Sequence, residues 1–406
     1  MKTIKYKRTL GALMLTIGLD VMGFLLIFPL FPTLFTEKHS LLVSAQAAPF
    51  WHYFYYALAL AVWPAGNFFG TAFLGEMSDR IGRKKILLLG LFLVFITYTL
   101  QTIAIYTQGL FLFIAARFVQ GFFGGNYDIA QAAVADISPP EQKARNMALI
   151  ALALSIGLVT GPIISALTVP SQIVLAATIT RPFWIASLLA VFNLIWISSV
   201  YQETYQPKTK RPIRLLKVFS AFLFVFADKR IQRLGIVYFL LDAGWGLYVQ
   251  QIPIIMQKLY HFTPHLIGYF FLVLGIGFIL AIQFLQPALV KRYQLKPIYI
   301  ISVIILGGLL LIAGIYPLLD IEWVTVFLMA VFHITGYGCL LAIISNAVTP
   351  DEQGQVMGGI GAVGSLAFGF SALSLAFFSI ISILMPIILA SVIYFVSGIL
   401  LVKYKK

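Results

Sequence analysis

Residues 75 to 85 read G-E-M-S-D-R-I-G-R-K-K, and this charged stretch decides the fold. The segments on either side, 51–74 and 86–106, contain no Asp, Glu, Lys or Arg. Each is long enough to cross a hydrocarbon core of roughly 30 Å as a helix. Gly82 can adopt the positive φ of a sharp reversal. The stretch is therefore predicted to be a tight turn that joins two membrane spans.

The rest of the chain has the composition of a polytopic membrane protein. Of 406 residues, 61% are hydrophobic and 10% are charged, which excludes an ordinary soluble domain. The apolar run after the basic N-terminus is too long for a signal peptide, so we expect a retained first helix. We predict an all-α protein with twelve transmembrane helices, near 10–31, 51–74, 86–106, 110–131, 146–169, 182–200, 234–257, 265–290, 297–317, 323–346, 355–378 and 383–402.

The distribution of basic residues predicts the orientation of the chain. Of 28 Lys and Arg residues, only Lys38, Arg181 and Lys258 fall outside the membrane if the N-terminus lies inside, and Arg117 falls within a span. This agrees with the positive-inside rule, so both termini are expected in the cytoplasm. The net charge of +14 is therefore expected to form a basic surface that contacts anionic lipid headgroups rather than nucleic acid. The single cysteine, Cys339, excludes an intrachain disulfide.

A long polar connection divides the chain into two halves. We expect one six-helix bundle at 1–200, a cytoplasmic central loop at 201–233, and a second six-helix bundle at 234–406. Within the loop, the apolar segment 218–227 is a candidate for an interfacial helix.

The charged turn resembles the loop between helices two and three in the major facilitator superfamily of secondary transporters. The residues on that motif are Gly75, Asp79, Arg80, Gly82, Arg83 and Lys84. The resemblance implies two pseudo-symmetric bundles around a central cavity, with this loop as the cytoplasmic gate. In the alternative interpretation, the basic residues only hold the loop in the cytoplasm.

The first span carries an acid near the middle of the membrane. Asp20 lies about ten residues from the inner end of the span, or ~15 Å deep at ~1.5 Å per residue. The pattern D-x-M-G-x-x-x-I-x-P-x-x-P resembles the first helix of the tetracycline-efflux-type drug:H⁺ antiporters. A carboxyl at this depth is a candidate proton carrier. A structural carboxyl, bonded to neighbouring helices, is the alternative.

The fourth span has a polar stripe on one helical face. Arg117, Gln120, Gly121, Gly124, Asp128 and Gln131 share this face, so we expect them to line a cavity. The A-R-x-x-Q-G portion resembles the superfamily's fourth-helix motif. That likeness implies that Arg117 tunes protonation of Asp20 or Asp128. A static salt bridge of Arg117 is the alternative.

The fifth span has small residues every four positions. Gly157, Gly161 and the following Pro162 predict close helix packing and a kink. G-x-x-x-G-P resembles the fifth-helix motif of the superfamily's exporters, although Ser165 and Ala166 replace its final glycines.

The second half contributes Asp242 and His333 to the spans. Asp242 is a candidate for proton coupling or substrate binding, whereas a lone histidine is more often a packing residue. The tetracycline exporters carry further acids in helices three and nine. Spans 86–106 and 297–317 have none, which argues against tetracycline as the cargo.

These observations favour a secondary transporter over an enzyme. The sequence has no nucleotide-binding loop, Cys/His cluster or catalytic triad, so we expect neither a cofactor nor a metal. The leading hypothesis is proton-coupled export of a small amphipathic compound, such as a drug or a siderophore-like metabolite, by a monomer in the bacterial inner membrane. The alternatives are a symporter that imports a nutrient or organic acid, and a membrane sensor that has lost transport.

Overall fold

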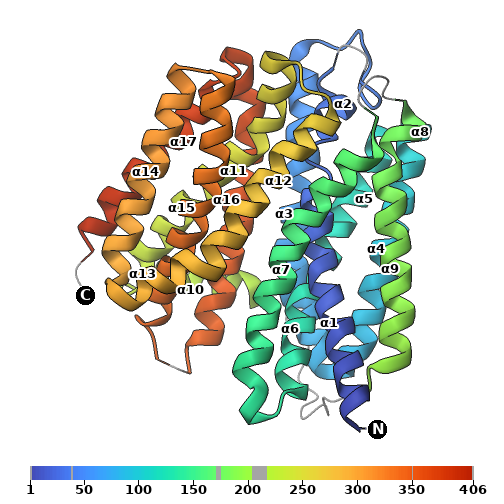
Figure 1. Cartoon of the computed structure of the whole chain (residues 1–406), viewed down its shortest axis with the longest axis vertical. Coiled ribbons are helices and arrows are strands. Elements are labelled where there is room, and N and C mark those ends of the chain that lie inside the picture. Colours follow the sequence, from blue (N-terminus) through green and yellow to red (C-terminus); the bar gives the residue numbers. More distant parts are fainter. Residues whose placement is uncertain (1, 38–39, 171–174, 204–216, 350, 405–406) are drawn as a thin grey trace.

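The computed structural model describes residues 2–37, 40–170, 175–203, 217–349 and 351–404, and these ranges contain helices and no strand. Figure 1 shows two helical bundles side by side. The elements are α1 (Lys2–Leu25), α2 (Phe31–Phe35), α3 (Pro49–Ile81), α4 (Arg83–Tyr106), α5 (Leu110–Phe123), α6 (Asn126–Ile137), α7 (Pro140–Thr168), α8 (Ala176–Ile179), α9 (Arg181–Val200), α10 (Lys217–Ala227), α11 (Gln232–Tyr260), α12 (Pro264–Leu280), the π-helix η1 (Ala281–Leu285), α13 (Gln286–Arg292), α14 (Leu295–Ile315), α15 (Leu319–Ser345), α16 (Gln353–Ile381) and α17 (Met385–Val402).

Ten helical segments of the described chain are long and apolar enough to cross a membrane. Two of them combine adjoining helices, α8 with α9 and α12 with α13. The pair α5–α6 and the 29-residue α11 run through the bundles in the same way (Figure 1). The structure is therefore an all-α membrane protein, consistent with twelve passages.

The charged turn is shorter than the sequence predicted. Helix α3 continues to Ile81, so residues 75–81 are helical, and α4 begins at Arg83. Gly82 alone makes the reversal, with a φ of 103°. Such a φ strongly favours glycine, so one residue sets the angle between two long helices.

The predicted fourth span is two helices and not one. Helix α5 ends at Phe123 and α6 begins at Asn126, with Gly124 and Gly125 between them. The single polar face expected from Arg117 to Gln131 is wrong for this reason, because a break changes the rotation of every later side chain. The first span is also interrupted, since α1 ends at Leu25 and turns lead into α2.

We call the side where α1 begins and α17 ends the termini side, and the opposite side the far side. At the far side, hydrogen bonds join the two halves. Lys258 Nζ donates to the carbonyl of Thr36 at 2.7 Å, Gln257 Nε2 donates to Glu37, and Tyr56 Oη donates to the carbonyl of Gln250 at 2.5 Å. With about 1 kcal/mol net from a typical bond, these contacts stabilise a closed far side.

Towards the termini side, the two halves separate. Midway through the membrane the halves are still in contact, because a Cβ added to Gly369 of α16 would lie 3.7 Å from the ring of Pro64 on α3. Nearer the termini, a Cβ on Gly354, Gly358 or Gly361 of α16 would meet nothing within 4 Å, and the same holds for Gly75 of α3. The structure is thus closed on the far side and open on the termini side.

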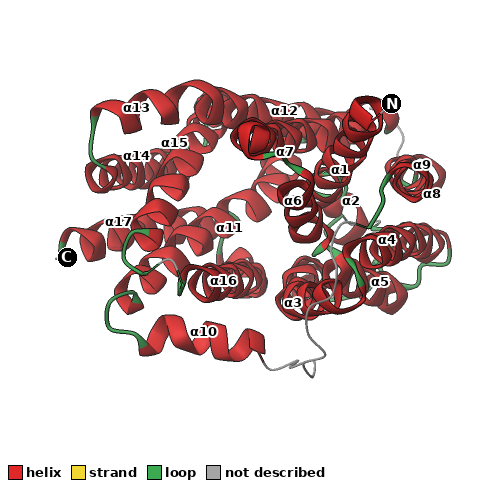
Figure 2. Cartoon of the chain, turned by 90° about the horizontal axis from the view of Figure 1, so that it is seen from below, coloured by secondary structure: helices red, strands yellow, loops and turns green. Residues whose placement is uncertain are grey.

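The predicted interfacial segment of the central connection is the helix α10. It packs against α16, where a Cβ on Gly359 would contact Ala221 and Val225. It also reaches the other half, because the ring of Phe219 lies 5.4 Å from that of Phe68 on α3. Figure 2 shows α10 along the outer edge of α16. The rest of the predicted central loop, 204–216, lies outside the described residues.

Candidate functional site

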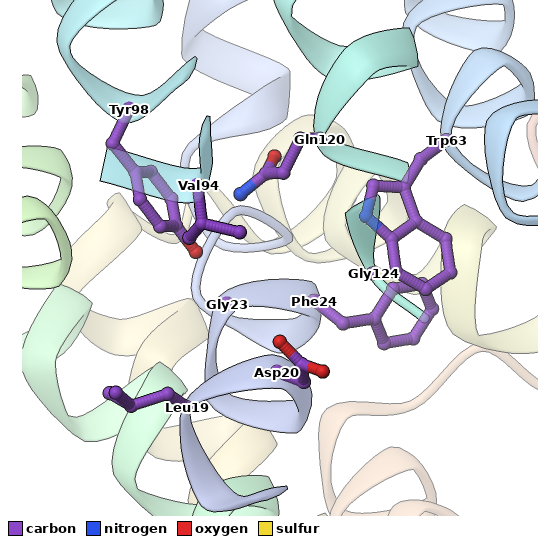
Figure 3. Close-up of a pocket in the computed structure, with 9 residues that line it drawn as sticks. All are labelled: Leu19, Asp20, Gly23, Phe24, Trp63, Val94, Tyr98, Gln120 and Gly124. Atoms are coloured by element: carbon purple, nitrogen blue, oxygen red, sulfur yellow. The ribbon is translucent and has the colours of Figure 1, made fainter. Parts of the chain in front are cut away.

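A small pocket in the N-terminal half surrounds the membrane carboxyl (Figure 3). Its enclosed space suits about one water molecule rather than a drug-sized ligand. Four helices, α1, α3, α4 and α5, supply most of its wall. The lining residues are Leu19, Asp20, Gly23, Phe24, Trp63, Val94, Tyr98, Gln120 and Gly124.

Asp20 supplies the acidic group of this pocket. Its Oδ2 atom is buried and has no hydrogen-bond partner among the described residues. The aromatic wall beside it crosses to the other half, since the ring of Phe24 lies 4.9 Å from Trp63 and 5.4 Å from Phe368 on α16. An acid and aromatic rings at the junction of the halves suit an amphipathic ligand.

Arg117 is fully buried beside the pocket, with 1% of its surface exposed. Its Nη1 donates to Gln120 Oε1 at 3.0 Å, and Gln101 Nε2 donates to the same oxygen at 3.2 Å. The guanidinium carbon lies 5.5 Å from the ring centre of Phe31. Within the described chain, Arg117 has no carboxylate within salt-bridge distance.

Tyr98 of α4 links Arg117 to Asp20. Its hydroxyl lies against Gly23, one turn from Asp20, and the amide of Gln120, which accepts from Arg117, borders the same space. The predicted influence of Arg117 on Asp20 would therefore pass through Gln120 and Tyr98. Sequence reasoning missed Tyr98, and its only signal was a polar aromatic residue within an apolar run.

The glycines of α5 have different roles. Gly124 lies on the pocket wall. Gly121, which we expected there, instead packs against α3, because a Cβ on it would collide with the carbonyl of Trp63. Cβ atoms on Gly66 and Gly70 of α3 would likewise collide with the backbone of α5. Gly121 thus allows α3 and α5 to touch along their backbones.

Asp128 lies in the first turn of α6 with an exposed side chain. It interacts electrostatically with Asp20 and with Tyr337 of the C-terminal half. It therefore faces the space between the halves, where a helix N-terminus stabilises a carboxylate. Gln131, one turn further along α6, is half-buried and is not among the pocket residues.

Asp242 belongs to an aromatic cluster in the C-terminal half. The Asp242 carboxyl and the Tyr238 hydroxyl border the same space beside Gly364 of α16, and Tyr238 donates to Tyr337 Oη at 3.3 Å. The predicted packing residue His333 stacks on Trp245, with ring centres 4.3 Å apart. Asp242 is therefore separate from the Asp20 pocket.

The small residues of α7 join two interfaces. A Cβ on Gly157 or Gly161 would stand 2.5 Å from the carbonyl oxygens of Gly18 and Met22, so α7 lies directly on the helix that carries Asp20. The carbonyl of Pro162 faces Gly268 of α12 in the other half. This arrangement lets α7 connect the Asp20 helix to the junction of the halves.

The predicted gate residues gather at the termini side. Arg83 Nε forms an ion pair with Asp136 of α6 at 2.6 Å, and Asp79 lies 4.0 Å from the same guanidinium. Lys84 Nζ donates to the carbonyl of Ser198 at 2.8 Å. Arg80 lies in the last turn of α3, where a cation is favoured. The side chain of Asp79 is 59% exposed.

Sequence reasoning also missed Glu322. We placed the tenth span at 323–346, one residue after it, whereas α15 begins at Leu319 and buries Glu322. An acid directly before Trp323 at the start of an apolar run was the available signal.

The sequence profile of the major facilitator superfamily matches residues 13–372. Tetracycline resistance protein class C of Escherichia coli is 27% identical over 375 residues, covering 89% of this chain and 87% of that protein. Human major facilitator superfamily domain-containing protein 10 is 26% identical over 408 residues, covering 89% and 85%.

Solved structures agree in fold. The human organic anion transporter MFSD10 (TETRAN) has a TM-score of 0.71 at 21% identity, covering 98% of this chain and 99% of that one. A D-xylose-proton symporter has a TM-score of 0.77 at 13% identity, covering 99% and 97%. The profile match spans most of the chain, and the paired bundles, the gate loop and the carboxyl pocket fit it: this protein belongs to the major facilitator superfamily of transporters.

Proposed function

We propose that this transporter exports a small amphipathic compound in exchange for protons, with Asp20 as the proton carrier. The observation that carries the proposal is the unpartnered, buried Oδ2 of Asp20 in a pocket walled by Phe24 and Trp63. An ionised carboxylate at membrane depth costs several kcal/mol unless it is neutralised. A proton or a polar group of the substrate supplies that neutralisation, and competition between the two couples their movements.

The arrangement of the two halves supports alternating access. The pocket lies in the N-terminal half, beside the contact of Phe24 with Phe368 of the other half. The far side is closed by contacts such as Lys258 to Thr36, and the termini side is open. We propose that the termini side is cytoplasmic, so that this conformation accepts substrate from the cytoplasm. Rocking of the halves would then open the far side.

Export is favoured over import by two features. Gly157, Gly161 and Pro162 form the exporter-like pattern on α7, and the relatives include tetracycline resistance proteins. The cargo differs from tetracycline in our proposal, because α4 and α14 carry no acid. We further propose that the protein acts as a monomer in a bacterial inner membrane.

The direction can be tested in inside-out vesicles that contain the protein. With an acidic lumen, amphipathic test compounds should accumulate in the lumen, and a protonophore should abolish the accumulation. Vesicles without the protein provide the control. Accumulation only in right-side-out vesicles with an acidic exterior would identify a proton-coupled importer and refute export.

A further inference from the structure

Glu322 is a buried acid that the Asp20 pocket does not use. It is the fourth residue of α15, in the far-side half of the C-terminal bundle, and 1% of its surface is exposed. Its Oε2 atom has no hydrogen-bond partner among the described residues. A buried carboxyl oxygen without a partner requires an explanation.

The groups around Glu322 are hydroxyls and aromatic rings. Tyr248 and Tyr260 of α11 interact with it electrostatically, and neither hydroxyl has a partner among the described residues. The neighbouring Trp323 packs its ring 4.9 Å from that of Phe270 and 6.3 Å from that of Phe262. One acid and two tyrosine hydroxyls without described hydrogen-bond partners thus lie in the same part of the C-terminal bundle.

No described basic group compensates the charge of Glu322. Helices α12, α14 and α16 and the π-helix η1, which has no charged residue, pack against α15 along with α11. The cation at the far-side end of α11, Lys258, donates to the carbonyl of Thr36 in the other half. The charged side chain of α14 is Lys296, which donates to the carbonyls of Val402 and Tyr404 near the termini side. In α12, His265 contacts the carbonyl of Ala166, and α16 has no charged residue.

Magnitudes then decide the state of the acid. The N-terminus of α15 stabilises a nearby carboxylate only modestly. Burial of an unpaired charge costs more than this stabilisation returns. Glu322 must therefore hold a proton, or another small cation, in this conformation.

We propose that Glu322 is a second proton-binding site, which exchanges its proton with the far side when that side opens. The carboxylate takes up one proton to become the neutral acid, and it releases that proton when its surroundings are hydrated. In the ionised form, Tyr248 and Tyr260 would donate hydrogen bonds to it. The role of Glu322 in transport rests on the proposed function, proton-coupled export. The protonation of Glu322 does not depend on that function.

Infrared difference spectroscopy of the purified full-length protein tests the protonation directly. In acidic buffer, the wild type should show a protonated-carboxyl band that Glu322→Gln lacks, because glutamine mimics the shape of the neutral acid but binds no proton. The band should persist in Asp20→Asn, so failure of the Asp20 mechanism would not remove it. Asp320→Asn, two residues away and exposed, is the matched control.

Transport stoichiometry tests the coupling. If export is proton-coupled, Glu322→Gln should lower the number of protons exchanged per substrate, while Asp320→Asn keeps the wild-type number. An identical spectrum and an identical proton count in Glu322→Gln would overturn the proposal. Loss of the band on addition of Na⁺ would also overturn it, by identifying a sodium site.

A second variant tests the proposal if Glu322→Gln does not fold. Glu322→Asp keeps an acid but shortens the side chain, so its carboxyl band should remain and titrate at a shifted pH. A wild-type spectrum that is unchanged by this substitution would show that the band does not come from position 322.

Discussion

The hydroxyl group of Tyr98 on α4 occupies the space that a Cβ atom on Gly23 of α1 would need. Gly23 lies one turn from Asp20, so its missing side chain brings the tyrosine into the pocket (Figure 3). Tyr98 can therefore interact with both Asp20 and Arg117. The identity of residue 23 thus controls the connection between the two charged groups.

Gly23→Ala is expected to displace Tyr98 and to lower the transport rate about tenfold, equivalent to about 1.4 kcal/mol. Tyr98→Phe removes the atom that collides, so Gly23→Ala should cost much less in that background. Transport rates of the wild type, the two single variants and the double variant give the interaction energy between residues 23 and 98. Additive losses would mean that the two residues act independently.

Asp20→Asn should retain the fold and membrane insertion but lose proton-driven accumulation, because an amide cannot exchange a proton here. Exchange of labelled for unlabelled substrate, which needs no net proton movement, should remain. Asp320→Asn makes the same change at an exposed site and serves as the control. If Asp20→Asn still accumulates substrate with unchanged pH dependence, Asp20 is not the proton carrier, and Asp128, Asp242 and Glu322 become the candidates.

Asp79 is expected to stabilise the state in which the termini side is closed. There it would approach the N-terminal end of α16, and about 1 to 2 kcal/mol from that contact would shift the equilibrium roughly 5- to 30-fold. Asp79→Asn should therefore favour the conformation described here and slow turnover more than it weakens substrate binding.

A cysteine at Gly361 reports on this equilibrium, since Gly361 has open space around it in the present conformation. In a Cys339→Ala background, its labelling from the termini side should be faster in Asp79→Asn. Equal labelling with normal turnover would leave the gate loop as a topological anchor.

The exposed ion pair between Arg230 and Glu352 should not contribute to the pH dependence of thermal stability near neutrality. Arg230 Nη2 donates to Glu352 Oε1 at 2.7 Å, and this contact with Arg230 lowers the pKa of Glu352 from 4.5 to about 2. A lowered pKa means that the stabilisation is complete above pH 4.5 and declines as the pH falls towards 2. The Tm difference between wild type and Glu352→Gln should be constant between pH 5 and 8, and a steep change there would contradict this assignment.

The sequence alone was sufficient for the architecture. Apolar runs of membrane length between charged connections require helices, because no other element except a closed barrel satisfies its backbone in lipid. The gate loop and the pattern around Asp20 pointed to the correct superfamily. The position of Gly82 and its positive φ also followed from the sequence, since glycine tolerates that conformation best.

The tertiary structure decided the surroundings of each charged group. Sequence spacing placed Arg117 and Asp128 on one helix face, but the break at Gly124 and Gly125 separates them. Hydropathy could not show that the Tyr98 hydroxyl lies against Gly23, one turn from Asp20, or that Glu322 is buried. Such contacts join residues far apart in the chain, and packing at glycines such as Gly23 and Gly121 fixes them. Local sequence therefore determined which helices form, and close packing between helices determined which charges meet.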